Sequence, residues 1–154
     1  MNISSMLNKG VKSVGIVFNM DPHDQSGSHW VAMYIDLKKW VISYFDSFGI
    51  CPPPIQIQRL IQSLNKNAVE VTGKKMFVNC NTNQHQIKNT ECGVYSMYFI
   101  VESLKGRSFN DISKKIILDD EINKYRDLFF RPSEKPKRTN TAQTAGGMRD
   151  FFYY

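Results

Sequence analysis

One junction in the sequence, at Cys92, constrains the fold more than any other feature. A polar stretch, 86–91, runs directly into an apolar segment of helix length that continues to Leu104. Because this segment is too apolar for a surface helix, we predict a buried central helix. Cys92 then lies in the first turn, where the helix dipole and the unpaired N–H groups favour a thiolate and could bind an oxyanion. Gly93 beside it would leave room for a substrate backbone.

A cysteine nucleophile needs a base, and an acid that orients the base. Two predicted strands, 27–36 and 40–46, are joined by a connection of hairpin length and contain His29 and Asp46. If the turn centres on residues 37–38, His29 and Asp46 are directly opposed and share one face of the sheet. A shift of one residue would put them on opposite faces, so the pairing depends on the register.

Four short motifs follow one another at compact spacing: His29-Trp30, Asp46-Ser47, Gln86 and Glu91-Cys92-Gly93. In this order they resemble the ULP/SENP–adenain cysteine proteases, over roughly residues 15–104. That family includes ubiquitin-like-protein-specific proteases and maturation proteases of large DNA viruses. The resemblance implies an α+β fold, in which a central helix carries the nucleophile and packs on a mainly antiparallel sheet.

The resemblance also implies a catalytic role for each motif. Cys92 would be the nucleophile, His29 the base, and Asp46 the acid that orients the imidazole. Gln86 would donate to the oxyanion, since its amide adds neither charge nor a competing base, and Gln84 is the second choice. We therefore expect a cysteine protease with a His-Asp-Cys triad and a glutamine in the oxyanion hole.

Substrate binding is assigned to the residues that flank this centre. Trp30 resembles the family tryptophan that walls a channel open only to glycine, and Glu91 and Gly93 border the nucleophile. The expected reaction is cleavage after glycine at Gly-Gly-X sites. The candidate substrates are a viral structural polyprotein, a ubiquitin-like modifier such as SUMO, and ubiquitin. The small domain and the motif region favour a maturation protease of a large DNA virus, while acyl transfer to an acceptor other than water stays open.

The three cysteines, Cys51, Cys80 and Cys92, are an odd number without framework spacing. This pattern predicts free thiols and a reducing compartment. No zinc-type spacing of Cys and His is present, so we expect neither a metal nor another cofactor. The N-terminus lacks a signal-peptide pattern and no apolar run could span a bilayer. We therefore expect an intracellular protein without a membrane partner, located in the host cytoplasm and virion if it is viral.

We assign residues 1–130 to the protease domain and residues 131–154 to an extended tail. Within the domain, residues 1–10 are predicted to be a frayed lead-in, residues 55–64 an amphipathic helix, and residues 74–80 a core strand. His23 is predicted to be a surface-loop histidine. His85 is a second candidate imidazole near Cys92 and ranks below His29, because no acid lies at a forced spacing from it.

The tail is basic at first, then carries a Gly-Gly pair, and ends in four aromatic residues. Ala145-Gly146-Gly147 resembles a diglycine cleavage site, and the aromatic end, 151–154, predicts docking on a partner protein. A net charge of +6 leaves a nucleic acid partner open. The alternative to an enzyme is a non-catalytic capsid- or nucleic-acid-associated binding module that keeps the protease fold.

Overall fold

A computed structural model describes residues 1–21, 29–130 and 152–153. The strands are β1 (Ser13–Asn19), β2 (Trp30–Asp36), β3 (Val41–Phe45), β4 (Phe77–Cys80) and β5 (Phe152–Tyr153). The helices are α1 (Ile3–Asn8), α2 (Ile55–Thr72), α3 (Cys92–Leu104), α4 (Phe109–Lys114), α5 (Asp119–Ile122), the 3-10 turn η1 (Asn123–Tyr125) and α6 (Arg126–Phe129). The predicted α+β class and the central helix beginning at Cys92 are both confirmed.

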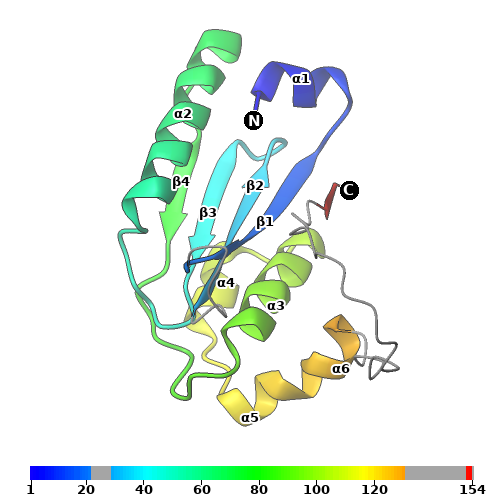
Figure 1. The fold of residues 1–154 in the computed structure, drawn as a ribbon. Helices are drawn as coiled ribbons and strands as arrows, with labels where there is room; N and C mark the ends of the chain where they lie inside the picture. Colours follow the sequence, from blue (N-terminus) through cyan, green and yellow to red (C-terminus); the bar gives the residue numbers. More distant parts are fainter. Residues whose placement is uncertain (22–28, 131–151, 154) are drawn as a thin grey trace, which may run out of the picture.

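The strands form one sheet in the order β4-β3-β2-β1-β5. All neighbouring strands are antiparallel except β3 and β4, which are parallel because α2 connects them. Figure 1 shows α3, α5 and α6 gathered on the side of the sheet away from α2. The sheet is therefore the middle layer of three.

The central strand β2 packs helices on both of its faces. Val31, Met33 and Ile35 join the core that contains α1 and α2. Ala32 and Tyr34 join the second core, which α3 dominates. This explains why β2 is buried almost throughout rather than alternating with solvent. The active-site candidates at the ends of β2, β3 and α3 are thus held by a two-sided core.

The prediction that residues 1–10 are a frayed lead-in is wrong. They form α1, whose Ile3 and Met6 are buried in the core beside α2. Asn2 caps the helix by accepting a hydrogen bond from the Ser5 N–H at 2.8 Å. The Asn67 side chain accepts one from the Ile3 N–H at 2.6 Å. The sequence pattern failed here because a single helical turn and a half shows no periodicity of its own.

The predicted hairpin register is also wrong, by two residues. Asp36 is opposed to Val41, so the connection is the four-residue loop 37–40. The Asp36 carboxylate accepts hydrogen bonds from the backbone N–H groups of Lys38 and Lys39, which favours the longer turn. Trp40 closes the loop in the left-handed conformation, at a φ of 61°. An even shift keeps every side chain on its predicted face.

The segment predicted to be a core strand lies at the edge of the sheet. In β4, which pairs only with β3 among the described strands, Phe77 is 67% exposed. The preceding helix, α2, extends beyond its predicted end at residue 64 to Thr72, where Gly73 caps it at a φ of 74°.

The prediction of three free thiols is wrong. Cys51 and Cys80 form a disulfide across 29 residues of sequence, and Cys92 is the free cysteine. Their spacing gave no sign of this pairing. The fold produces it by bringing the loop before α2 beside the end of β4.

Candidate active site

His29 and Asp46 lie at the same end of the central hairpin. His29 directly precedes β2 and Asp46 directly follows β3, and these strands are antiparallel. Imidazole Nε2 lies 3.0 Å from carboxylate Oδ1. In the observed register the two residues are diagonal rather than directly opposed, so they still share a face.

The backbone on either side of His29 and Asp46 is held firmly. The His29 carbonyl accepts a hydrogen bond from the Met20 N–H at 2.9 Å, which extends the β1–β2 pairing by one step. The imidazole packs on Phe48, with ring centroids 5.0 Å apart. Asp46 is only 2% exposed and its Oδ1 also accepts from the Phe48 N–H at 2.8 Å. The carboxylate is therefore fixed before any substrate arrives.

Asn81 supports Asp46 from the loop after β4. Its side-chain Oδ1 accepts from the Asp46 N–H at 2.8 Å, and its Nδ2 donates to the Asp46 carbonyl at 2.7 Å. Asn81 is itself 2% exposed. This two-point contact crosses 35 residues of sequence, so no local pattern could have indicated it.

Cys92 is the first residue of α3 and is 6% exposed. Burial favours the neutral thiol, but the interactions with His29 and with the Trp30 and Gly93 backbones outweigh burial and lower the pKa of Cys92. The hydrogen bond to Asp46, followed by the interaction with Cys92, raises the pKa of His29 to about 9. These opposite changes favour an imidazolium–thiolate pair.

The two ring nitrogens of His29 have different surroundings. Nε2 is taken by Asp46, whereas Nδ1 is buried and makes no hydrogen bond of normal geometry within the described residues. Cys92 nevertheless lies near enough to raise the pKa of the ring. Nδ1 is therefore the nitrogen available for exchanging a proton with the thiol.

Gln86 is fully buried in the loop between β4 and α3. Its Oε1 accepts a hydrogen bond from the Ser47 hydroxyl at 2.6 Å, and its Nε2 donates to the Lys88 carbonyl at 2.5 Å. The Ser47 carbonyl accepts from the backbone N–H groups of His85 and Gln86. Ser47 thus fixes both the backbone position of Gln86 and the orientation of its side-chain amide. Gln84 instead donates to the Gln86 carbonyl at 2.8 Å.

The three predicted substrate-binding residues differ in how much of each side chain is exposed and in what it contacts. Trp30 begins β2 and is 36% exposed. The Glu91 carboxylate is buried and accepts from the Thr90 hydroxyl at 2.5 Å. A Cβ on Gly93 would meet Phe130 only at 3.9 Å, an ordinary contact. Substrate binding by these residues stays a prediction.

His85 is buried and packs among core residues. Its Nε2 lies 3.0 Å from the Ser113 carbonyl, its ring packs edge-on against Phe45 and Tyr95, and burial lowers its pKa. His23 lies outside the described residues.

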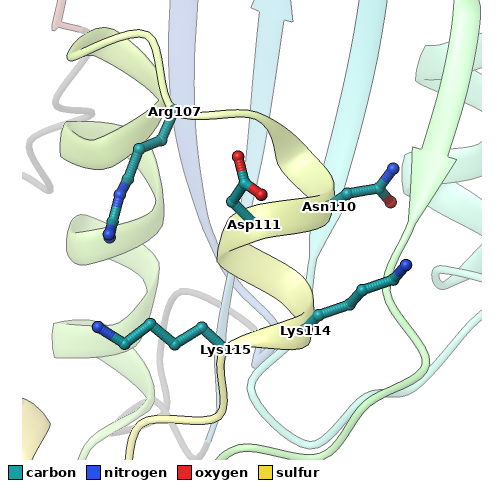
Figure 2. Close-up of a pocket in the computed structure, with 5 residues that line it drawn as sticks. All are labelled: Arg107, Asn110, Asp111, Lys114 and Lys115. Atoms are coloured by element: carbon teal, nitrogen blue, oxygen red, sulfur yellow. The ribbon is translucent and has the colours of Figure 1, made fainter.

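A surface hollow of about 580 Å³ lies over α4, and its lining includes none of His29, Asp46 and Cys92. Figure 2 shows Lys114 and Asn110 pointing to one side of α4, and Arg107 and Lys115 to the other. Arg107 is already paired with Glu102 at 2.9 Å. Within residues 1–21 and 29–130, no group of three or more His, Cys, Asp or Glu side chains could hold a metal ion. In that same part of the chain, no helix has the length and apolar character needed to cross a membrane.

Comparison with known proteins identifies the family of this chain. Residues 5–137 match the family model described as the Ulp1 protease family, C-terminal catalytic domain. Protein R355 of Acanthamoeba polyphaga mimivirus, whose name describes a thiol protease, is 34% identical over 131 residues, covering 85% of this chain and 43% of the relative. The SUMO-1 cysteine protease S273R of African swine fever virus is 37% identical over 123 residues, covering 76% and 43%.

The same viral protease has a similar structure. A crystal structure of the selenomethionine form of the African swine fever virus pS273R protease superposes with a TM-score of 0.68 and 29% identity, covering 79% of this chain and 45% of that one. The chain spans less than half the length of the curated relatives it matches. The family match spans the segment that contains His29, Asp46 and Cys92, and the chain belongs to the Ulp1 protease family, matching its C-terminal catalytic domain.

Proposed function

We propose that this chain is a cysteine endopeptidase that cleaves after glycine at Gly-Gly-X sites. The observation that carries the proposal is the position of His29, hydrogen-bonded to Asp46 through Nε2 while Nδ1 remains available beside Cys92. Family membership supports hydrolysis of a peptide bond as the reaction.

In this mechanism Cys92 attacks as a thiolate. His29 holds the thiol proton on Nδ1, and Asp46 accepts a hydrogen bond from Nε2 and stabilises the positive ring. The sulfur forms a bond to the carbonyl carbon of the glycine before the cut, and the carbonyl π electrons move to oxygen. When the carbon–nitrogen bond breaks, His29 gives its proton to the leaving amine. Water, deprotonated by His29, then releases the acid product and restores the thiol.

The oxyanion formed in both steps needs hydrogen-bond donors. The Cys92 backbone N–H at the start of α3 is one candidate. Gln86 is the other, because its Nε2 has a second hydrogen beyond the one donated to the Lys88 carbonyl. Since Ser47 occupies Oε1, the amide would present its donor side without needing to reorient.

The substrate is proposed from the relatives and from Trp30. The African swine fever virus relative is named a SUMO-1 cysteine protease, which favours a protein with a diglycine site. Trp30, which directly follows His29 in the chain and is 36% exposed, is proposed as the wall that excludes larger side chains. A viral structural polyprotein and a ubiquitin-like modifier both carry such sites, so we propose one of these as substrate, in infected host cells and in the virion.

We retain the domain division at residues 130 and 131 as a proposal. Residues 131–151 and 154 lie outside the described part of the chain, including the Gly-Gly pair proposed as a self-cleavage site. The backbone of Phe152 and Tyr153 pairs with Gly15 and Val14 of β1. Docking of the aromatic end on a partner protein, and contact of the basic residues with nucleic acid, remain proposals.

The test is labelling with a peptide probe that ends in Gly-Gly and carries a vinyl electrophile, read by intact mass. We expect one adduct on the wild type, none on Cys92→Ala, and a slower reaction on His29→Ala. His85→Ala is the matched control, because it removes the buried structural histidine and should leave the labelling ratio per folded molecule unchanged. Absence of an adduct on folded wild type, also with DNA or a partner protein added, would favour the non-catalytic binding module instead.

A further inference from the structure

The carboxylate of Asp119 makes contacts that the proposed mechanism does not use. Asp119 begins α5 and is 5% exposed. Its Oδ2 accepts hydrogen bonds from two successive backbone N–H groups, those of Ile87 at 3.0 Å and Lys88 at 2.8 Å. Its Oδ1 accepts from the Tyr95 hydroxyl at 3.1 Å. Because the Tyr95 hydroxyl shares its single hydrogen with the Ile117 carbonyl at 2.8 Å, the two backbone N–H groups are the firm donors that fix this buried carboxylate.

The two N–H groups belong to the residues that directly follow Gln86. Gln86 Nε2 donates to the Lys88 carbonyl at 2.5 Å, so the position of Lys88 decides where the amide nitrogen lies. The backbone N–H of the same residue, Lys88, donates to the Asp119 carboxylate. The Asp119 contact and the Gln86 amide are therefore linked through one backbone unit.

The Tyr95 contact connects this arrangement to the nucleophile. Tyr95 lies in α3, one helical turn after Cys92, and is 1% exposed. Its hydroxyl lies 2.8 Å from the Ile117 carbonyl and 3.1 Å from Asp119. Asp119 thus contacts both the loop that carries Gln86 and the helix that begins with Cys92.

We propose that Asp119 is a positioning residue for the oxyanion hole, which sets the Gln86 amide relative to Cys92 by binding the Ile87 and Lys88 N–H groups. It does not touch the reacting atoms. The inference rests on the proposed role of Gln86 as an oxyanion donor. It predicts that loss of the Asp119 charge matters for catalysis only while Gln86 is present.

A double-mutant cycle tests this link. kcat/KM for a fluorogenic Gly-Gly peptide is measured for the wild type, Asp119→Asn, Gln86→Ala and the double variant. Asp119→Asn should lower kcat/KM about tenfold in the wild type, a part of the full effect of one oxyanion donor, and should have almost no effect on the Gln86→Ala background. Equal losses in both backgrounds would overturn the proposal, since they would indicate general structural support.

Asp120→Asn is the matched control. Asp120 is the next residue, and its carboxylate pairs at 2.7 Å with the Lys88 ammonium group rather than with the backbone. Its side chain is 89% exposed, so its loss should leave kcat/KM unchanged. If Asp119→Asn does not fold, Tyr95→Phe replaces it, because it removes the hydroxyl donor from Oδ1 and keeps the ring.

Amide hydrogen exchange gives a readout that does not require activity. Asp119→Asn should speed exchange at Ile87 and Lys88 and shift the Gln86 side-chain NH₂ resonances, while the α2 amides stay unchanged. Unchanged Gln86 resonances would overturn the positioning role. An inactive wild type that shows these changes would refute the proposed protease function and leave the Asp119–Gln86 link standing. An active wild type with full activity in Gln86→Ala would refute the link to catalysis alone.

Discussion

Asp46→Asn should move the alkaline limit of activity to lower pH. In the wild type, Asp46 is the largest cause of the rise in the His29 pKa from 6.5 to about 9. At 1.36 kcal/mol per pKa unit, this difference favours the protonated ring by about 3 kcal/mol. That figure is an upper value, because the imidazole side chain is 18% exposed and water screens part of the interaction.

The mechanism gives the direction in which kcat/KM changes with pH. His29 must be protonated to donate to the leaving amine, so kcat/KM should fall as pH rises through about 9. On the acid side, activity should fall as Cys92 becomes protonated, below the ordinary thiol pKa, because that pKa is lowered. The asparagine keeps the shape of Asp46 and removes its charge, so the alkaline limb should move down by at least roughly one pH unit.

The assay is the pH dependence of kcat/KM on a Gly-Gly peptide, together with an NMR titration of the His29 ring in each protein. Asp120→Asn, which removes an exposed carboxylate far less coupled to the ring, should keep the wild-type profile. An alkaline limb and a His29 titration that are the same in Asp46→Asn and the wild type would refute the assignment of Asp46 as the group that holds the proton on His29.

Three further results are expected. Gln86→Ala should lower kcat/KM by about a hundredfold, as for a single oxyanion donor, whereas Gln84→Ala should not; a larger loss in Gln84→Ala would reverse the assignment. Asn81→Ala leaves the Asp46 N–H unpaired and its carbonyl with the Gly49 N–H alone, so urea titration should show a loss of about 1–3 kcal/mol in unfolding free energy and kcat/KM should fall too; unchanged activity would mean that Asp46 is held without it. Ile3→Ala should cost about 2–5 kcal/mol of unfolding free energy, while the exposed Leu7→Ala on the same helix costs little; equal small costs would show that α1 is not part of the core.

The disulfide and the edge strand show where sequence reasoning fails. Cys51 and Cys80 have neither the spacing nor the number typical of a disulfide framework, yet the fold bonds them. Phe77 and Val78 look like core residues because both are apolar, but β4 ends the sheet and leaves them 67% and 39% exposed. Apolar character predicts a strand, whereas the order of strands decides which faces are covered.

The sequence by itself determined the elements whose signals are local. The apolar run after Cys92 predicted α3, and two strand-like segments around a short connection predicted β2 and β3 with His29 and Asp46 at their ends. Even the wrong register left this pair together, because a shift of two residues preserves the face on which a side chain lies.

The tertiary structure decided everything that depends on contacts between distant parts of the chain. Asn81 reaches Asp46 across 35 residues, and Asp119 reaches Lys88 across 31. Such contacts leave no periodic trace, since a buried asparagine or aspartate is chosen by the unpaired N–H and carbonyl groups it meets in the folded protein. The sequence therefore named the reacting groups, and only the fold showed which residues hold them in place.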